Sequence, residues 1–406
     1  MKRFLPYLVL IFTILEISHA QEKKVVFILL DGIPADVIES VETPIIDEIA
    51  NLGGYSRAYV GGEKGGYSQT PTISAPGYMN MITGVWANKH NVWGNGVKAP
   101  NYNYLNVFRI IKNAQPDKKT AIFSTWLDNR TKLVGESLPE TNQFKFDYSF
   151  DGFELDTITY PHDSEREYIY NIDEHVTKET ARYIKSEAPD LSWVYLEFTD
   201  DMGHKYGDSP QMIDAVKKAD AQVGRIWQAI KYRESVHDED WMIVITTDHG
   251  RTAKDGKGHG GQSERERTTW IVMNQENINP KFHNNPAIID IMPSILTHFK
   301  VEPTDDIKKE IDGVSLLDRI AVSDLNANYA NGKLNLGWVN YGANEVEILI
   351  SDTNNFKSRG KDEYELLGSI RSSRQSFSKE VSLPTGTYKI LIKSPLNWIN
   401  TWLVIE

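Results

Sequence analysis

Three mostly apolar segments of the chain are each followed closely by acidic residues. They are Val25–Leu30, Trp193–Phe198 and Met242–Thr247. Apolar runs of this length without regular polar alternation are typical of strands that are buried on both faces of a parallel sheet. The carboxyl ends of parallel strands meet at one edge of the sheet, where open α/β folds bind their ligands. The pattern therefore predicts that carboxylates from three distant parts of the chain lie at one edge.

Segments with helical spacing of apolar residues lie between these predicted strands. A helix that runs to about Thr83 is also expected, with Pro76 in its first turn, where proline is tolerated, and Ser74 just before it. The alternation of strands and helices predicts an α/β fold with a mostly parallel sheet and helices on both faces. The further predicted helices cover 43–51, 104–112, 164–186 and 209–232, and a further predicted strand covers 120–124.

The pattern changes near residue 323. From there to residue 406 we find no helical period, and short strand-like runs alternate with Gly, Asn, Pro and Ser. This is typical of a small antiparallel β-sandwich. We therefore expect a catalytic region over 21–322 and an accessory β-sandwich over 323–406. The five predicted strands of the sandwich are 333–339, 345–351, 376–381, 388–392 and 401–405.

The first twenty residues resemble a secretory signal peptide. Lys2 and Arg3 precede an apolar run, and small residues offer a cleavage site before Gln21. An uncleaved anchor is the alternative, although the apolar run is short for a membrane span. The sequence contains no cysteine, as suits a protein exported to a bacterial periplasm, and after cleavage we expect no integral membrane span.

The balance of charge excludes one class of partner. The chain has 44 basic and 56 acidic residues, a formal net charge of −12. So acidic a protein is not expected to bind nucleic-acid polymers. An anionic substrate would have to be captured locally by cations, and without cysteine those cations cannot be held by thiolates.

Carboxylates and histidines in the predicted loops have the character of metal ligands. Crowded carboxylates repel one another unless a cation neutralises them. Asp200 and His204 follow a predicted strand, in a turn that can point both side chains at one ion, and His259 can complete the set. Oxygen and imidazole ligands suit zinc, with manganese or iron as alternatives. A second set comprises Asp31, Asp248 and His249.

Ser74 is the candidate nucleophile. It would lie close to the unpaired N–H groups and the positive dipole end of a helix, a favourable place to attack a phosphate. Thr70 and Thr72 are the alternative nucleophiles. Asn95, 21 residues after Ser74, is the candidate for binding a phosphate oxygen.

The order of these residues resembles the alkaline phosphatase superfamily, and within it the type I phosphodiesterase/nucleotide pyrophosphatase family. The matching motifs are PTISAPGYMNMITG, which contains Ser74, then DDMGHKYG and DHG, over about residues 24 to 320. The resemblance implies two zinc sites. Asp200, His204 and His259 would hold one ion, and Asp31, Ser74, Asp248 and His249 would hold the other.

The resemblance also implies an activity. It indicates a secreted two-metal hydrolase of small phosphate esters, similar to phosphodiesterases and nucleotide pyrophosphatases, that works through a phosphoseryl intermediate on Ser74. The position of Asn95 resembles that of the phosphate-binding asparagine in some monoesterases of the superfamily, so a phosphomonoesterase or a phosphonate hydrolase is the alternative. The non-enzyme alternative is a degenerate catalytic domain whose C-terminal part binds glycan or a cell surface.

Overall fold

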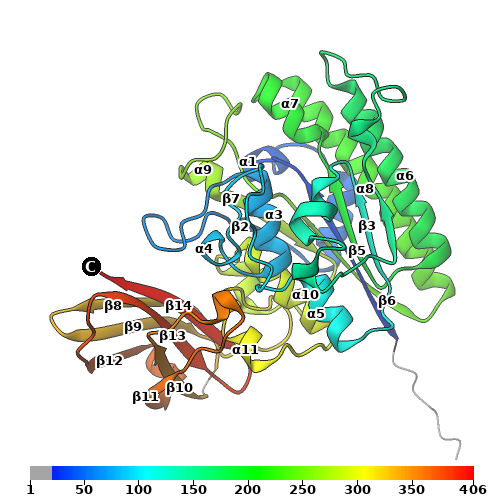
Figure 1. Ribbon diagram of the computed structural model, residues 1–406. Helices are drawn as coiled ribbons and strands as arrows, with labels where there is room; N and C mark the ends of the chain where they lie inside the picture. Colours follow the sequence, from blue (N-terminus) through cyan, green and yellow to red (C-terminus); the bar gives the residue numbers. More distant parts are fainter. Residues whose placement is uncertain (1–20, 343) are drawn as a thin grey trace, which may run out of the picture.

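A computed structural model describes residues 21–342 and 344–406 (Figure 1). The predicted signal peptide lies outside the described residues. Within the described part of the chain, no helix has both the length and the apolar character that crossing a bilayer requires.

A seven-stranded sheet forms the centre of the larger part of the molecule. Its strand order is β2-β7-β6-β1-β5-β3-β4, and the five strands from β6 to β4 run parallel. The mostly parallel sheet is thus confirmed. The sequence did not predict β2 and β7, which form an antiparallel edge beside β6. The strands are β1 (Glu22–Leu30), β2 (Gly54–Tyr59), β3 (Thr120–Ser124), β4 (Tyr148–Phe150), β5 (Leu191–Leu196), β6 (Glu239–Thr246) and β7 (Thr268–Met273).

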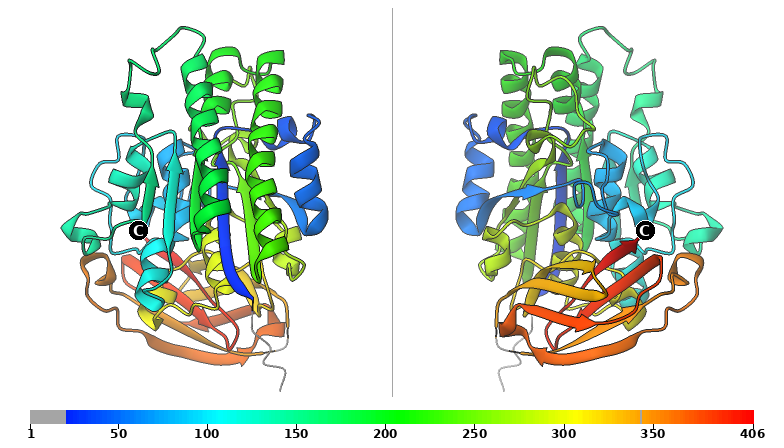
Figure 2. Two further views of the ribbon diagram at one scale, coloured as in Figure 1. Left: turned by 90° about the vertical axis from the view of Figure 1, so that its right-hand side faces the viewer. Right: turned by 90° about the vertical axis from the view of Figure 1, so that its left-hand side faces the viewer.

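Helices cover both faces of this sheet, as predicted. Alternate residues of β1 contribute to two different apolar cores: Phe27 and Leu29 pack with α3, α5 and α10, whereas Ile28 and Leu30 pack with α1, α2, α6, α7 and α8. Burial on both sides explains why β1 has no polar alternation. Figure 2 shows the long helices α6 and α8 covering one face. The helices are α1 (Ala35–Ile38), α2 (Pro44–Leu52), α3 (Ser74–Thr83), α4 (Ala87–His90), α5 (Val107–Ala114), α6 (Glu167–Glu187), α7 (Phe198–Tyr206), α8 (Pro210–Val236), α9 (Glu264–Arg267), α10 (Ile291–His298) and α11 (Asp305–Lys308).

The C-terminal part contains two antiparallel sheets that share one apolar core. One has the order β11-β10-β13-β14 and the other β12-β9-β8. The predicted sandwich architecture is therefore confirmed, although β8 and β11 were not among the predicted strands. The strands are β8 (Val322–Ala330), β9 (Lys333–Asn340), β10 (Glu345–Ser351), β11 (Glu365–Arg371), β12 (Ser376–Glu380), β13 (Gly386–Lys393) and β14 (Trp398–Ile405).

Buried lysines join the two parts of the molecule, with the sandwich lying below the central sheet in the view of Figure 1. Lys89 Nζ on α4 donates to Asn400 Oδ1 on β14 at 2.8 Å, and Lys389 Nζ on β13 donates to Glu310 Oε1 at 2.6 Å. Both lysine side chains are almost fully buried, so each needs these partners to offset the loss of hydration. The exact division at residue 323 stays a prediction.

Candidate metal centre

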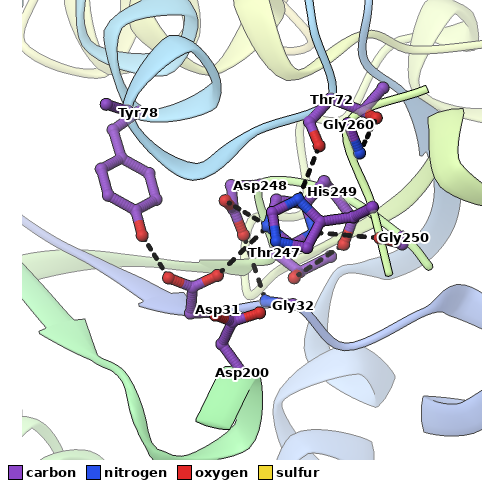
Figure 3. Close-up of polar contacts among 12 residues, drawn as sticks. Asp31, Gly32, Thr72, Tyr78, Asp200, Thr247, Asp248, His249, Gly250 and Gly260 are labelled. Atoms are coloured by element: carbon purple, nitrogen blue, oxygen red, sulfur yellow. Dashed lines mark hydrogen bonds and ion pairs between the residues drawn. The ribbon is translucent and has the colours of Figure 1, made fainter. Parts of the chain in front are cut away.

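The register of the central strands brings distant acidic residues together. Leu30 at the end of β1 pairs with Leu196 at the end of β5, and Leu29 pairs with Thr246 at the end of β6. The chain therefore leaves all three strands at the same edge. There the Gly32 N–H donates to Asp248 Oδ1 at 3.1 Å, which joins the segments after β1 and β6 (Figure 3).

Three polar atoms without hydrogen-bond partners face one another at this edge. Asp31 Oδ1, Asp248 Oδ2 and His249 Nε2 are all buried, and none finds a partner in the described part of the chain. His249 Nε2 lies 3.3 Å from Asp248 Oδ2 and 3.6 Å from Asp31 Oδ1. His249 Nδ1–H donates to the Gly250 carbonyl oxygen at 2.9 Å, which leaves the lone pair on Nε2. Two carboxylate oxygens and an imidazole nitrogen in this arrangement fit a divalent cation.

The pKa values of Asp31, Asp248 and His249 also favour a bound cation. Burial and the nearby charge of Asp200 together raise the pKa of Asp31 to about 7. Burial and Asp31 together raise the pKa of Asp248 well above its usual range, while burial keeps the pKa of His249 well below its own. Without a cation, two adjacent buried carboxylates resist ionisation. A positive ion would remove that penalty, and a neutral imidazole is the form that ligates.

Two tyrosines orient Asp31. The hydroxyls of Tyr78 on α3 and Tyr195 on β5 both donate to Asp31 Oδ2, the latter at 2.7 Å. Because Oδ2 is engaged, Oδ1 is the oxygen left to face Asp248 and His249. Neither tyrosine was among the residues predicted from the sequence. The only available signal was that Tyr78 lies one helical turn after Ser74.

A second donor group adjoins the first. Asp200 and His204 lie on helix α7, so the predicted turn is wrong; at i and i+4 both side chains still share one face. His204 Nε2 is 3.3 Å from Asp200 Oδ2 and 3.0 Å from His259 Nε2. His259 Nδ1–H donates to the Thr72 carbonyl oxygen at 3.0 Å, so its Nε2 carries the lone pair. His259 also stacks on His249, with ring centroids 3.7 Å apart, which joins the two groups.

Ser74 is the first residue of helix α3, whereas the prediction placed it just before the helix. The chain on either side of Ser74 touches both donor groups, because Thr72 binds His259 and Gly77 packs directly against Asp248. The Ser74 hydroxyl has no hydrogen-bond partner in residues 21–342 and 344–406. The segment that carries Ser74 therefore contacts both donor groups, and the Ser74 hydroxyl is uncommitted.

The two alternative nucleophiles are engaged elsewhere. The Thr72 hydroxyl donates to the Gly261 carbonyl oxygen at 2.8 Å and accepts from the Gly260 N–H at 3.0 Å. The Thr70 hydroxyl donates to a carbonyl oxygen at 3.0 Å and accepts a backbone N–H at 3.1 Å. Both hydroxyls thus have structural roles in the loop before α3, and Ser74 is the better candidate.

Asn95 lies beside the candidate nucleophile. Its Oδ1 accepts from the Ala75 N–H, the residue after Ser74, at 3.0 Å. This contact places the amide at the start of α3 and leaves the NH₂ group to donate. All seven predicted ligands and Asn95 are thus found in one region of the molecule, and their roles as ligands and substrate contacts stay predictions.

Known proteins resemble this chain over much of its length. Residues 25–314 match the sequence profile described as type I phosphodiesterase/nucleotide pyrophosphatase. Ectonucleotide pyrophosphatase/phosphodiesterase family member 7 of Rattus norvegicus is 25% identical over 257 residues, which are 59% of this chain and 53% of the rat protein. The chain therefore spans about half the length of this curated relative.

Solved structures share the fold. An inactive variant of murine ectonucleotide pyrophosphatase/phosphodiesterase 5, in complex with AMP, superposes with a TM-score of 0.51 at 13% identity, covering 70% of this chain and 96% of the murine chain. A protein in the alkaline phosphatase superfamily from Vibrio parahaemolyticus superposes with a TM-score of 0.50 at 15% identity, covering 89% of this chain and 83% of its own. Since the profile match extends over well more than half of its length, the chain belongs to the type I phosphodiesterase/nucleotide pyrophosphatase family.

Proposed function

We propose that this protein is a two-metal hydrolase of phosphate diesters that acts through a phosphoseryl intermediate on Ser74. The observation that carries the proposal is a set of three buried ligand atoms, on Asp31, Asp248 and His249, that find no partner among the described residues. They adjoin a second donor group and a serine hydroxyl that is likewise without a partner in that part of the chain. Such atoms are costly to bury unless something binds them. One divalent cation, zinc in the first place, would satisfy these three atoms, and the adjoining donor group would hold a second.

Each donor group has a distinct task in this proposal. Asp200, His204 and His259 would hold one cation, and Asp31, Asp248 and His249 the other, with Ser74 as its fourth ligand. When bound, the cations would neutralise the carboxylates, attract the phosphate and favour the ionised form of the attacking hydroxyl.

The start of helix α3 serves the phosphate. Ser74 lies at the positive end of a ten-residue helix, where an anion is stabilised. The Asn95 oxygen is bound to the Ala75 N–H, so its NH₂ group would be the part that donates to a phosphate oxygen.

The reaction proceeds by two displacements at phosphorus. The Ser74 oxygen forms a bond to phosphorus as the bond to the leaving alcohol breaks, and the serine proton leaves with that alcohol. Water then attacks the phosphoseryl group, which releases the phosphorylated product and restores the serine hydroxyl. Attack and departure on opposite sides of phosphorus are the usual course of such displacements.

A small phosphate ester is the proposed substrate. The murine relative described above was solved with AMP, which supports nucleotide derivatives as a substrate class for this chain as well. We further propose export through the leader at residues 1–20 into a periplasm, and contact of the C-terminal sandwich with glycan or a cell surface.

The test compares Ser74→Ala with the wild-type enzyme on bis-p-nitrophenyl phosphate and p-nitrophenyl phosphate. We expect the diester to be hydrolysed faster, and Ser74→Ala to lower turnover by at least about 10³-fold. The metal content, measured by mass spectrometry, should stay near two ions per chain. Thr70→Val serves as the matched control, because it removes a hydroxyl from the same loop and should keep most activity.

Each result decides between the functions considered. Faster hydrolysis of the monoester would favour the phosphomonoesterase. Two bound ions without turnover of either ester would favour a binding protein. Full activity of Ser74→Ala would exclude the covalent mechanism.

A further inference from the structure

Arg251 follows the Asp248-His249-Gly250 segment directly and is only 1% exposed. Its guanidinium group connects three segments of the metal centre. Nε donates to the Gly32 carbonyl oxygen at 2.9 Å, after strand β1. Nη1 donates to the Lys257 carbonyl oxygen at 3.3 Å, in the loop that leads to His259.

The third nitrogen of the guanidinium group binds Asp200. Arg251 Nη2 donates to the Asp200 carbonyl oxygen at 2.8 Å and forms an ion pair with Asp200 Oδ1. Because Oδ1 is taken by Arg251, only Oδ2 is turned toward His204.

Two glycines provide the space for this side chain. A Cβ atom at Gly203, on the face of α7 between Asp200 and His204, would lie 2.1 Å from Arg251 Cζ. A Cβ atom at Gly32 would lie 2.7 Å from Arg251 Nη2 and 2.5 Å from Asp200 Oδ1. All three distances are far below a van der Waals contact. Helix α7 and the end of β1 therefore approach the guanidinium group as closely as their backbones permit.

We propose that Arg251 is a positioning residue for the cation held by Asp200, His204 and His259. It fixes Asp200 with a single oxygen directed at the site, and it ties α7 to the loop that carries His259. This inference rests on the proposed two-metal function. It names a residue outside the ligand set that determines how tightly one of the two ions binds.

Replacing Arg251 has two effects on metal affinity, and they act in opposite directions. A buried positive charge beside a metal ligand repels the cation, so removing that charge would strengthen metal binding if charge were the only effect of Arg251. Loss of positioning has the opposite effect, and outer-shell partners of metal ligands typically contribute 10- to 100-fold in affinity. We expect positioning to dominate, because four polar contacts orient the guanidinium group and no single group replaces them.

The experiment measures zinc binding rather than turnover. Metal-free wild-type protein, Arg251→Met and Arg251→Lys are titrated with zinc in competition with a chromophoric chelator. Bound zinc is then counted after dialysis. We expect both variants to lose roughly 10- to 100-fold in affinity for one of the two ions and to keep the other. Lysine should not rescue binding, because a single ammonium group cannot reproduce the planar fork.

A distant arginine controls for loss of stability. Arg233→Met removes a partly buried ion pair with Glu239, the first residue of β6, away from the metal centre. This variant should unfold at a lower temperature than the wild type yet bind two zinc ions with unchanged affinity. If Arg251→Met does not fold, Arg251→Lys carries the measurement, because it preserves the buried charge.

Several outcomes would overturn the proposal. Equal or tighter zinc binding by Arg251→Met would show that Arg251 only balances charge. An equal loss of both ions, or the same loss in Arg233→Met, would show that it acts through general stability. If wild-type protein itself bound no zinc, the proposed function would fail, and that result is distinct from a failure of the Arg251 inference.

Discussion

Gly77 offers the sharpest test of how closely the nucleophile helix must approach the metal centre. It lies within α3, three residues after Ser74, and a Cβ atom at this position would be 2.9 Å from Asp248 Cβ and 3.0 Å from the Asp248 carbonyl oxygen. Asp248 is fully buried, and the atoms that the new methyl group would meet are backbone or close to it. Neither neighbour can move away by changing a rotamer.

Two effects of Gly77→Ala oppose each other. Replacing glycine by alanine inside a helix contributes about 0.5 to 1 kcal/mol of stability. Inserting a methyl group into a closely packed site costs about 1 to 3 kcal/mol. The contacts with Asp248 are shorter than carbon–carbon and carbon–oxygen contacts normally are, so we expect the cost to dominate, with a net loss of about 1 to 2 kcal/mol. The displacement of Asp248 should also weaken zinc binding.

Gly224→Ala is the matched control. Gly224 is also a helical glycine, on α8, but its nearest neighbour would be the Ile45 side chain at 3.2 Å, which can shift by a few tenths of an ångström. We expect this variant to be unchanged or stabilised by up to about 1 kcal/mol. Urea unfolding gives the free energy of unfolding for both variants, and zinc titration gives the affinity. Gly77→Ala with wild-type stability and zinc affinity would refute the steric reasoning.

Three further results are expected. Chelation should lower the melting temperature, because a cation present at 100 times its Kd contributes about 2.7 kcal/mol to the free energy of unfolding. Added zinc should restore the melting temperature. A melting temperature that chelation leaves unchanged contradicts a bound metal. Asn95→Asp keeps the oxygen that accepts from the Ala75 N–H but loses the NH₂ donor, so kcat/KM should fall about 10²-fold. An unaltered kcat/KM would contradict a role of Asn95 in phosphate binding. Burial lowers the pKa of His90 from near 6.5 to about 3. Burying the neutral imidazole therefore contributes its full share to the free energy of unfolding above pH 6.5, and this share is lost as the pH falls toward 3. Between pH 6.5 and 5, the free energy of unfolding of the wild type should therefore fall by about 2 kcal/mol more than that of His90→Asn. Urea unfolding at both pH values measures the two losses. Equal losses would contradict a lowered pKa of His90.

Much of the site was predictable because it follows the ends of buried strands. The apolar run of β1 and its abrupt end at Asp31 needed no knowledge of the tertiary fold, and the same holds for β6 before Asp248. A strand buried on both faces must be apolar throughout, and parallel strands end at a common edge. The antiparallel strand β2 was less visible, because its burial is irregular and glycine-rich chain follows it.

The sequence by itself determined which chemical groups are present and in what order along the chain: three carboxylates, three imidazoles and a serine hydroxyl. Only the tertiary structure decided which atoms face one another. Hydrogen bonds from Tyr78 and Tyr195 to Oδ2 leave Oδ1 of Asp31 free. The bond from Nδ1–H to the Thr72 carbonyl oxygen leaves Nε2 of His259 free. The ion pair of Arg251 with Oδ1 leaves Oδ2 of Asp200 free. These choices depend on hydrogen bonds between residues up to about two hundred positions apart. Local periodicity has no information about them, because it reports only which face of an element is buried.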